Sequence, residues 1–190
     1  EGEVKAWVDD VDGSLHSLTI DADRETEIDT YNNGFALSGA IASGSVGAGV
    51  AVLHDKSYTL AALNNAIFTR TGDKSTSKVE VKANNRNDVH TEVSTNTLAA
   101  SLGAAVGVAV EVVNIDAQVG SLVSNSTLGS NSTGFANFAA KANNNLINTF
   151  QNVTDAASTI GALAVGVGVL NINSQTTTTV DNSDAYADNV

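Results

Sequence analysis

The sequence contains no cysteine and no proline in 190 residues. Without cysteine the chain has neither a disulfide framework nor a thiolate metal site, so an oxidising extracellular location is permitted. Proline removes a hydrogen-bond donor from a β-ladder, and it has almost no place in a stack where every strand has neighbours on both sides. The absence of proline is therefore typical of a long parallel β-solenoid.

Large side chains are also scarce, because aromatic residues make up only 5% of the sequence and methionine is absent. The chain is long enough for one domain with a sizeable core, but a globular core would be hard to fill without such side chains. The common residues are Ala, Val, Asn, Thr, Ser and Gly, which suit narrow layers of small or β-branched side chains. This composition favours a solenoid over a globule.

Basic residues are few: 9 Lys and Arg stand against 21 Asp and Glu, for a net charge of −12. Nucleic acid and anionic lipid surfaces require the opposite sign, so we expect neither as a partner. The sequence begins at Glu1 and shows no apolar signal segment and no basic n-region. We therefore expect it to be an interior piece or a processed product.

Three related stretches organise the chain: Leu98–Ile115, Leu37–Leu53 and Ser158–Ile172. Each alternates between branched and small residues with the period of two that is typical of a β-strand. In the middle stretch the branched row is Leu102, Ala104, Val106, Val108, Val110 and Val112. The small row, named here the glycine/alanine row, comprises Gly103, Ala105, Gly107 and Ala109, and in the third stretch Ala162, Ala164, Gly166 and Gly168. A repeated strand of this kind predicts a stack.

A transmembrane helix is the alternative for the middle stretch, because Gly103 and Gly107 form a GxxxG pattern in an apolar run. The run is shorter than the roughly 20 residues that a bilayer requires, and Glu111 interrupts it. Valine alternating with glycine is also poor helix material. We therefore expect no membrane insertion.

The two rows of the repeated strand imply two different environments. We expect the branched row to face a dry core, so that Val108, Val110, Val165 and Val167 point inward and carry the stability. Glycine inside a strand weakens it unless another backbone approaches closely, so we expect the glycine/alanine row to be covered. The cover is either another part of the chain or a neighbouring copy in a fibre, and we favour the neighbouring copy.

The repeat has a period of about 60 residues, since Leu53, Val113 and Leu170 occupy corresponding positions. We expect one all-β segment over residues 1–190, a parallel β-helix (β-solenoid). Its units are roughly 17–76, 77–134 and 135–190, and residues 1–16 end a preceding unit. A single rung takes roughly 20 to 30 residues, so each unit should supply two or three rungs. Asn-rich corners are expected at Asn84–Asn85 and at 143–145, where stacked amides can form ladders.

One acidic segment is a weak calcium candidate. Asp9, Asp10 and Asp12 match a calcium loop in acid density, but the DxDxDG spacing and the later bidentate Glu are missing. We interpret the segment as an acidic turn closed by Gly13. We expect no metal site and no cofactor.

Catalytic patterns are equally weak. The three histidines, His16, His54 and His90, fall at unrelated positions of the repeat and show no metal-ligand spacing. Parallel β-helices do host polysaccharide lyases and hydrolases, but those enzymes need clustered acids with Arg or Lys over a groove. Here basic residues are few and scattered, so we assign no catalytic residue.

The chain resembles the repeat region of large secreted filamentous adhesins, most closely the leukotoxin-type and filamentous-haemagglutinin-like proteins of Gram-negative bacteria. The motifs that carry the resemblance are Val106–Asp116 with Val79–Ala83, and Val165–Asn173 with Ala139–Ala142; residues 1–36 match least. The resemblance implies a right-handed parallel β-helix shaft that is exported by a two-partner or autotransporter route. It carries no catalytic residue over to this chain.

Two functional hypotheses remain. The first is a structural or adhesive segment of an extracellular, cell-surface filament, which associates with neighbouring copies and contacts a host or cell-surface receptor. The second is a carbohydrate-active β-helix, a polysaccharide lyase or hydrolase. The enzyme requires a cluster of acids and bases that does not repeat, whereas the fibre requires the same residue types on successive rungs.

Overall fold

The structure is a computed structural model that describes residues 2–38, 44–99 and 103–190. Leu102, the first member of the branched row, lies outside these residues. The described chain is almost entirely strand, with a single 3-residue 3-10 helix, η1, and the expectation of an all-β fold is confirmed. The elements are β1 (Gly2–Leu15), β2 (Ser17–Ser38), β3 (Ser45–Arg70), η1 (Lys74–Thr76), β4 (Lys78–Ala99), β5 (Ala104–Ser124), β6 (Thr127–Leu128), β7 (Phe135–Ser158), β8 (Gly161–Asp181), β9 (Asp184–Ala185) and β10 (Ala187–Asn189).

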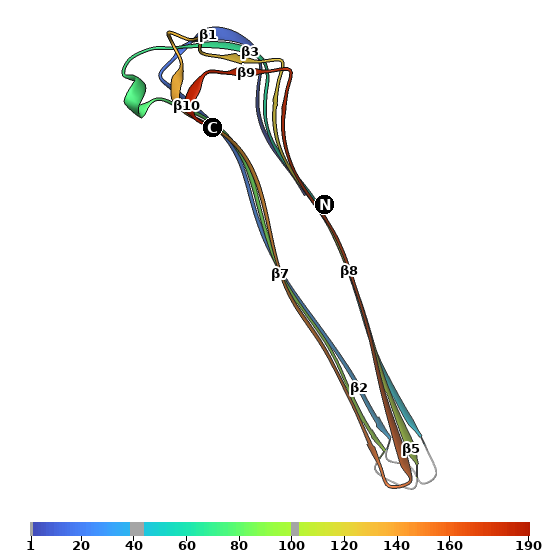
Figure 1. Ribbon diagram of the computed structural model, residues 1–190. Helices are drawn as coiled ribbons and strands as arrows, with labels where there is room; N and C mark the ends of the chain where they lie inside the picture. Colours follow the sequence, from blue (N-terminus) through green and yellow to red (C-terminus); the bar gives the residue numbers. More distant parts are fainter. Residues whose placement is uncertain (1, 39–43, 100–102) are drawn as a thin grey trace.

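The strands form two parallel sheets that face each other (Figure 1). The six-stranded sheet has the order β8-β5-β3-β6-β9, with β1 also beside β3, and the four-stranded sheet has the order β10-β7-β4-β2. The chain crosses from one sheet to the other and back, so that β2 and β3, β4 and β5, and β7 and β8 form three successive circuits. The parallel β-solenoid is therefore confirmed; its hand stays a prediction.

Each circuit consists of two strands of more than 20 residues. Val46 pairs with Val106 and Val106 pairs with Leu163, so one circuit takes 60 residues in the first case and 57 in the second. The expectation of two or three rungs per unit is wrong. Each unit of about 60 residues forms a single circuit, because two long strands replace the expected short strands and bends. A 22-residue strand such as β4 is about 70 Å long. Figure 1 shows the result, a long, narrow two-layer blade with a broader head that holds β9, β10 and η1.

The asparagine-rich segments are not corners. Asn84 and Asn85 lie inside β4, and 143–145 lie inside β7, although their amides do form the expected ladders. Asn143 Nδ2 donates to Asn84 Oδ1 at 2.9 Å, for example. Among the non-glycine residues, left-handed backbone occurs instead at the bend near the head, at one position in β1 and one in each of the three circuits: Asp10, then Asn65, Asn125 and Asn182. Asparagine and aspartate tolerate this conformation better than most residues, which explains their place in the bend.

The interior holds two main apolar clusters of buried side chains. The larger lies toward the head and includes Leu63, Phe68, Leu128, Phe135 and Phe138. The smaller lies farther along the blade and is built from Val89, Val113, Ile115 and Ala117. Beyond it the interior narrows, and small side chains fill the space between the sheets.

The assignment of the two rows to core and surface is wrong. Ala105 and Ala109 are buried, whereas Val106, Val108 and Val110 lie on the outer side of the six-stranded sheet. The reason is the closeness of the two sheets: a Cβ added at Gly107 would lie 3.0 Å from the Asp155 carbonyl oxygen of the opposite sheet. Valine does not fit in this gap, so the branched row must face outward.

Because Val108 faces outward and Ala109 faces inward, a charge should destabilise the fold at position 109 and not at position 108. Val108→Asp should keep the fold and cost about 1 kcal/mol or less, because its carboxylate reaches water. Ala109→Asp should cost about 3 kcal/mol or more, because it places an unpaired charge in a dry interior. Thermal unfolding followed by far-ultraviolet circular dichroism compares the two variants. If Val108→Asp unfolds while Ala109→Asp melts with the parent protein, the valines face inward.

Candidate functional surfaces

The glycine/alanine row, expected to be a partner surface, faces the four-stranded sheet of the same chain. In β5 and just before it, Gly103, Ala105, Gly107 and Ala109 are buried. The strand β8 belongs to the last circuit, and its part of the row is more exposed but also faces the four-stranded sheet: Ala162, Ala164, Gly166 and Gly168. A Cβ at Gly166 would lie 2.7 Å from Asn152 Oδ1, and one at Gly168 would overlap the Phe150 ring. The cover is therefore the chain itself, and the preference for a neighbouring copy on this row is wrong.

The opposite side of the same strands carries an apolar surface. Four columns of side chains cross β3, β5 and β8 in register, and we name this set the valine face: Val46, Val106 and Leu163; Ala48, Val108 and Val165; Val50, Val110 and Val167; Val52, Val112 and Val169. None of these residues is charged or polar. Val46 is 71% exposed and Val52 is 68% exposed. An exposed apolar patch of this extent is unusual for a soluble protein and indicates an interaction surface.

Both ends of the stack present open strand edges within the described chain. At one end β8 pairs only with β5, and β10 covers β7 only at Phe135 and Asn137. At the other end β2 pairs only with β4, and β1 covers β3 only from Ser57 onward. An open edge presents a row of unpaired N–H and C=O groups that can accept another strand.

A buried polar network joins the two sheets between the apolar clusters. Arg24 Nη1 donates to Asn87 Oδ1 at 2.8 Å and to Asn85 Oδ1 at 3.3 Å, while its Nη2 lies 3.6 Å from Asp55 Oδ1. Asn87 Nδ2 donates to Asp55 Oδ2 at 2.9 Å, and Asn85 Nδ2 donates to Asn144 Oδ1 at 2.8 Å in the next circuit. The Arg24 and Asp55 side chains are only 10% and 5% exposed. The charged groups of Arg24 and Asp55 and the amides of Asn85 and Asn87 bind one another. The network therefore acts as a structural clamp between the two sheets.

Glu111 is a second buried acid, and it lies in the same row as the interior glycines. It is fully buried between Ala51 and Gly168 of the neighbouring strands. Neither carboxyl oxygen has a hydrogen-bond partner among the described residues. A buried carboxyl without a partner is costly, so Glu111 weakens the middle circuit.

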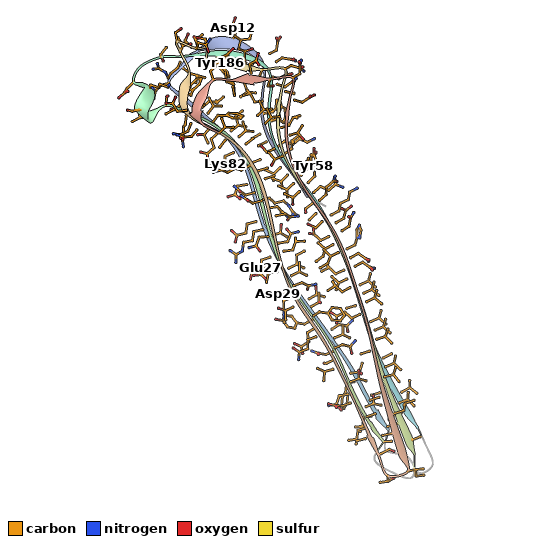
Figure 2. All side chains as sticks on the ribbon, viewed as in Figure 1. Asp12, Glu27, Asp29, Tyr58, Lys82 and Tyr186 are labelled. Carbon is orange, nitrogen blue, oxygen red and sulfur yellow. The ribbon has the colours of Figure 1, made fainter. Side chains whose placement is uncertain are left out.

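Acids and bases gather on the outer side of the four-stranded sheet, where Figure 2 shows Lys82, Glu27 and Asp29. Lys78 Nζ lies 3.2 Å from a Glu80 carboxylate oxygen, and Arg86 Nη1 lies 2.9 Å from Glu25 Oε1. This set does not repeat from circuit to circuit, which is the arrangement that the enzyme hypothesis requires.

Glu80 is the least exposed carboxylate of the set. Partial burial alone would raise the pKa of its carboxyl, but the hydrogen bond from Lys78 and the charges of Lys82, Lys78 and Lys141 lower the pKa below its ordinary value. A general acid requires the opposite shift. The arrangement is that of ion pairs on an outer sheet face and does not suit proton transfer to a substrate.

A shallow hollow lies on the outer side of the six-stranded sheet, where Gly120 stands between Leu60 and Thr177 in one column. Its rim includes Tyr58, labelled in Figure 2, together with Gln118 and other uncharged side chains. The lining contains no carboxylate, histidine, lysine or arginine. The hollow can offer hydrogen bonds and one aromatic ring, but no acid–base pair.

The calcium candidate is not assembled into a site. Asp9 Oδ1 accepts hydrogen bonds from Asn64 Nδ2 at 2.8 Å and Asn65 Nδ2 at 3.3 Å, and Asp10 occupies the left-handed bend. Across residues 2–38, 44–99 and 103–190 no group of three or more His, Asp or Glu side chains could hold a metal ion. The Asp9 carboxylate instead binds the asparagines of the neighbouring strand, and Asp10 and Asp12 are exposed.

Comparison of the chain with protein-family models, with curated proteins and with solved structures gives no match. In the part of the chain that the structure describes, no helix is long and apolar enough to cross a membrane.

Removal of one partner of the buried ion pair should be strongly destabilising. Asp55→Ala leaves the Arg24 guanidinium buried without a counter-charge, at a cost of about 3 kcal/mol or more. The double variant Arg24→Leu with Asp55→Leu removes both charges and should recover part of this loss. Urea unfolding of the two variants measures the difference. A double variant that is no more stable than Asp55→Ala would contradict the clamp.

Glu111→Ala should stabilise the protein, because it removes the unpartnered carboxyl and matches the small neighbours Ala51 and Gly168. The expected gain is about 1–3 kcal/mol in the free energy of unfolding. Glu27→Ala, on the outer side of the four-stranded sheet, serves as the control and should change stability little. Chemical unfolding at neutral pH gives both values, and a loss of stability in Glu111→Ala would show that the carboxyl has a partner.

Proposed function

We propose that this chain is a non-catalytic structural or adhesive segment of an extracellular bacterial surface filament, a stretch of adhesin shaft. The observation that carries the proposal is the stack itself: three circuits pair in register, and β3, β5 and β8 repeat the same alternation of small and branched residues. A shaft of this kind lengthens by adding circuits, each of which pairs with the previous one through two long strands.

Side-chain ladders across the circuits support a shaft. Asn171 Nδ2 donates to Asn114 Oδ1 at 2.8 Å, and Asn182 Nδ2 donates to Asn125 Oδ1 at 2.7 Å. The last member of each ladder has its free side at the end of the stack, where a further circuit would continue the row. Identical amides stacked at the strand spacing of about 4.8 Å stabilise each other in this way.

The extracellular setting is supported by chemistry and by resemblance. The chain has no thiol that an oxidising environment could alter. The Gly/Val strand motifs resemble those of secreted filamentous adhesins of Gram-negative bacteria. A host or cell-surface receptor would meet the outer faces of the two sheets, since the inner faces are closed against each other.

The carbohydrate-active alternative is the weaker of the two. Its acids and bases would have to come from the outer side of the four-stranded sheet, where carboxylates are paired with Lys78, Lys82 and Arg86. The lowered pKa of Glu80 disfavours a general acid there. The uncharged hollow beside Tyr58 supplies no catalytic pair either.

Concentrated protein should stack end to end, with the open edge of β7 in one copy against the open edge of β2 in the next. Aligned samples should then show an X-ray reflection at about 4.8 Å along the stacking direction. Asn143→Lys with Asn173→Lys places a lysine on each of the two edge strands at one end, and charged edges resist pairing. This variant should remain folded and lose the stacking.

The matched control is Asn96→Lys with Gln118→Lys, which adds the same charge to the middle circuit, away from both edges. It should stack as the parent protein does. Equal stacking by the edge variant, or turnover of an acidic polysaccharide by the purified chain, would contradict the proposal.

A further inference from the structure

The valine face is a regular apolar surface that no other segment of the described chain covers. It spans four columns and three strands, from the Val46 column to the Val52 column. Beyond the Val52 column the polar column of His54, Asn114 and Asn171 begins. On the inner side of the same strands the glycine/alanine row is already packed. The outer side therefore needs a partner that does not come from the described chain.

We propose that the valine face binds the valine face of a second copy, so that two stacks pair side by side. The pair would have four layers, with the two six-stranded sheets in contact at the centre and the two four-stranded sheets outside. The charged outer sides of the four-stranded sheets would then face water in both copies. Such a contact uses the same patch on both partners and closes after two copies.

Charge allows a second copy to approach on this face and disfavours anionic partners. Two chains that each carry a net charge of −12 repel each other over most of their surface. On the valine face they can approach without placing acid against acid, because no residue of the face is charged. The same net charge disfavours anionic lipid and nucleic acid as occupants.

The shape of the face also suits a copy of itself. Valine is β-branched and stiff at χ1, so the rows lose little side-chain freedom on contact. The rows repeat at the strand spacing of about 4.8 Å along the stack, and an identical surface repeats at the same spacing. Two flat sheet faces of this kind pack at about 10 Å in β-sandwiches.

The area of the valine face that two copies bury determines how strongly they bind. Four columns over three strands give a flat footprint of about 400 Å² per copy. A standard stable interface buries about 800 Å² per partner. The 190-residue chain should therefore pair weakly and reversibly, and a stack of about twice as many circuits should pair stably. Side-by-side pairing would thus strengthen with the length of the shaft.

Sedimentation equilibrium over a range of concentrations tests the pairing. In the stacking-deficient background of Asn143→Lys with Asn173→Lys, the chain should show a reversible dimer. Adding Val165→Asp with Val167→Asp should lower its association constant about a hundredfold, because like charges would meet at the contact. The matched control is Ile147→Asp with Val153→Asp on the outer side of the four-stranded sheet. The exposed fractions of the control residues Ile147 and Val153 are 40% and 37%, close to the 37% and 44% of the test residues Val165 and Val167. The control should dimerise as the parent does.

Crosslinking locates the contact and separates it from end-to-end stacking. The chain has no cysteine, so Val108→Cys introduces a single thiol at the middle of the face. A short bis-maleimide should join two Val108→Cys chains and should leave Val153→Cys chains unjoined. The stacking-deficient variant with lysines at 143 and 173 should still pair, which distinguishes a failure of this inference from a failure of the shaft proposal.

Three results would overturn the inference. The first is a parent chain that stays monomeric at every concentration. The second is equal dimerisation of the test and control variants. The third is a chain that stays monomeric but binds vesicles of neutral phosphatidylcholine through Val165 and Val167, which would assign the face to lipid.

Discussion

The close approach of two sheets is the constraint on which the rest of this structure depends. Where the sheets meet along β5, the Asp155 carbonyl oxygen lies 3.0 Å from the place of a Cβ at Gly107. Glycine leaves enough room at such a distance, and a larger side chain there would push the sheets apart. The narrow interior explains why a chain with so few aromatic residues can still close a dry layer over strands of about 70 Å.

The same constraint moves the larger aliphatic side chains to the outside. Val106, Val108 and Val110 alternate with the small row, so when the small row faces inward the valines must face outward. A connected polar network lies in the interior around Arg24 and Asp55. Other buried polar groups, among them Thr95, Thr97 and Glu111, have no hydrogen-bond partner in the described chain. The outer valines are the feature that a second copy would cover.

The sequence predicted the class of fold but not the direction of its faces. The period of two, the repeated Gly/Val stretch and the absence of proline were sufficient for an all-β parallel stack. They could not tell which row faces inward, because valine, alanine and glycine are all commonly buried residues. The nearness of the partner sheet decides between the two rows, and the sequence does not show that distance. The asparagines of β4 and β7 were misread for a related reason: Asn84 and Asn143 form a ladder within straight strands, and composition alone cannot distinguish such a ladder from a bend.

The central claim, that the glycine/alanine row is interior and the valine row exterior, can be measured at two adjacent residues. Ala51 is 8% exposed and Val52 is 68% exposed, and the chain has no cysteine of its own. Ala51→Cys and Val52→Cys therefore each give a single thiol whose labelling rate by a maleimide reports its exposure in the folded, dilute protein. The structure predicts that Val52→Cys reacts nearly as fast as the unfolded chain, whereas Ala51→Cys reacts at least about a hundredfold more slowly, because it must wait for the sheets to open. Equal rates, or faster labelling of Ala51→Cys, would contradict the account.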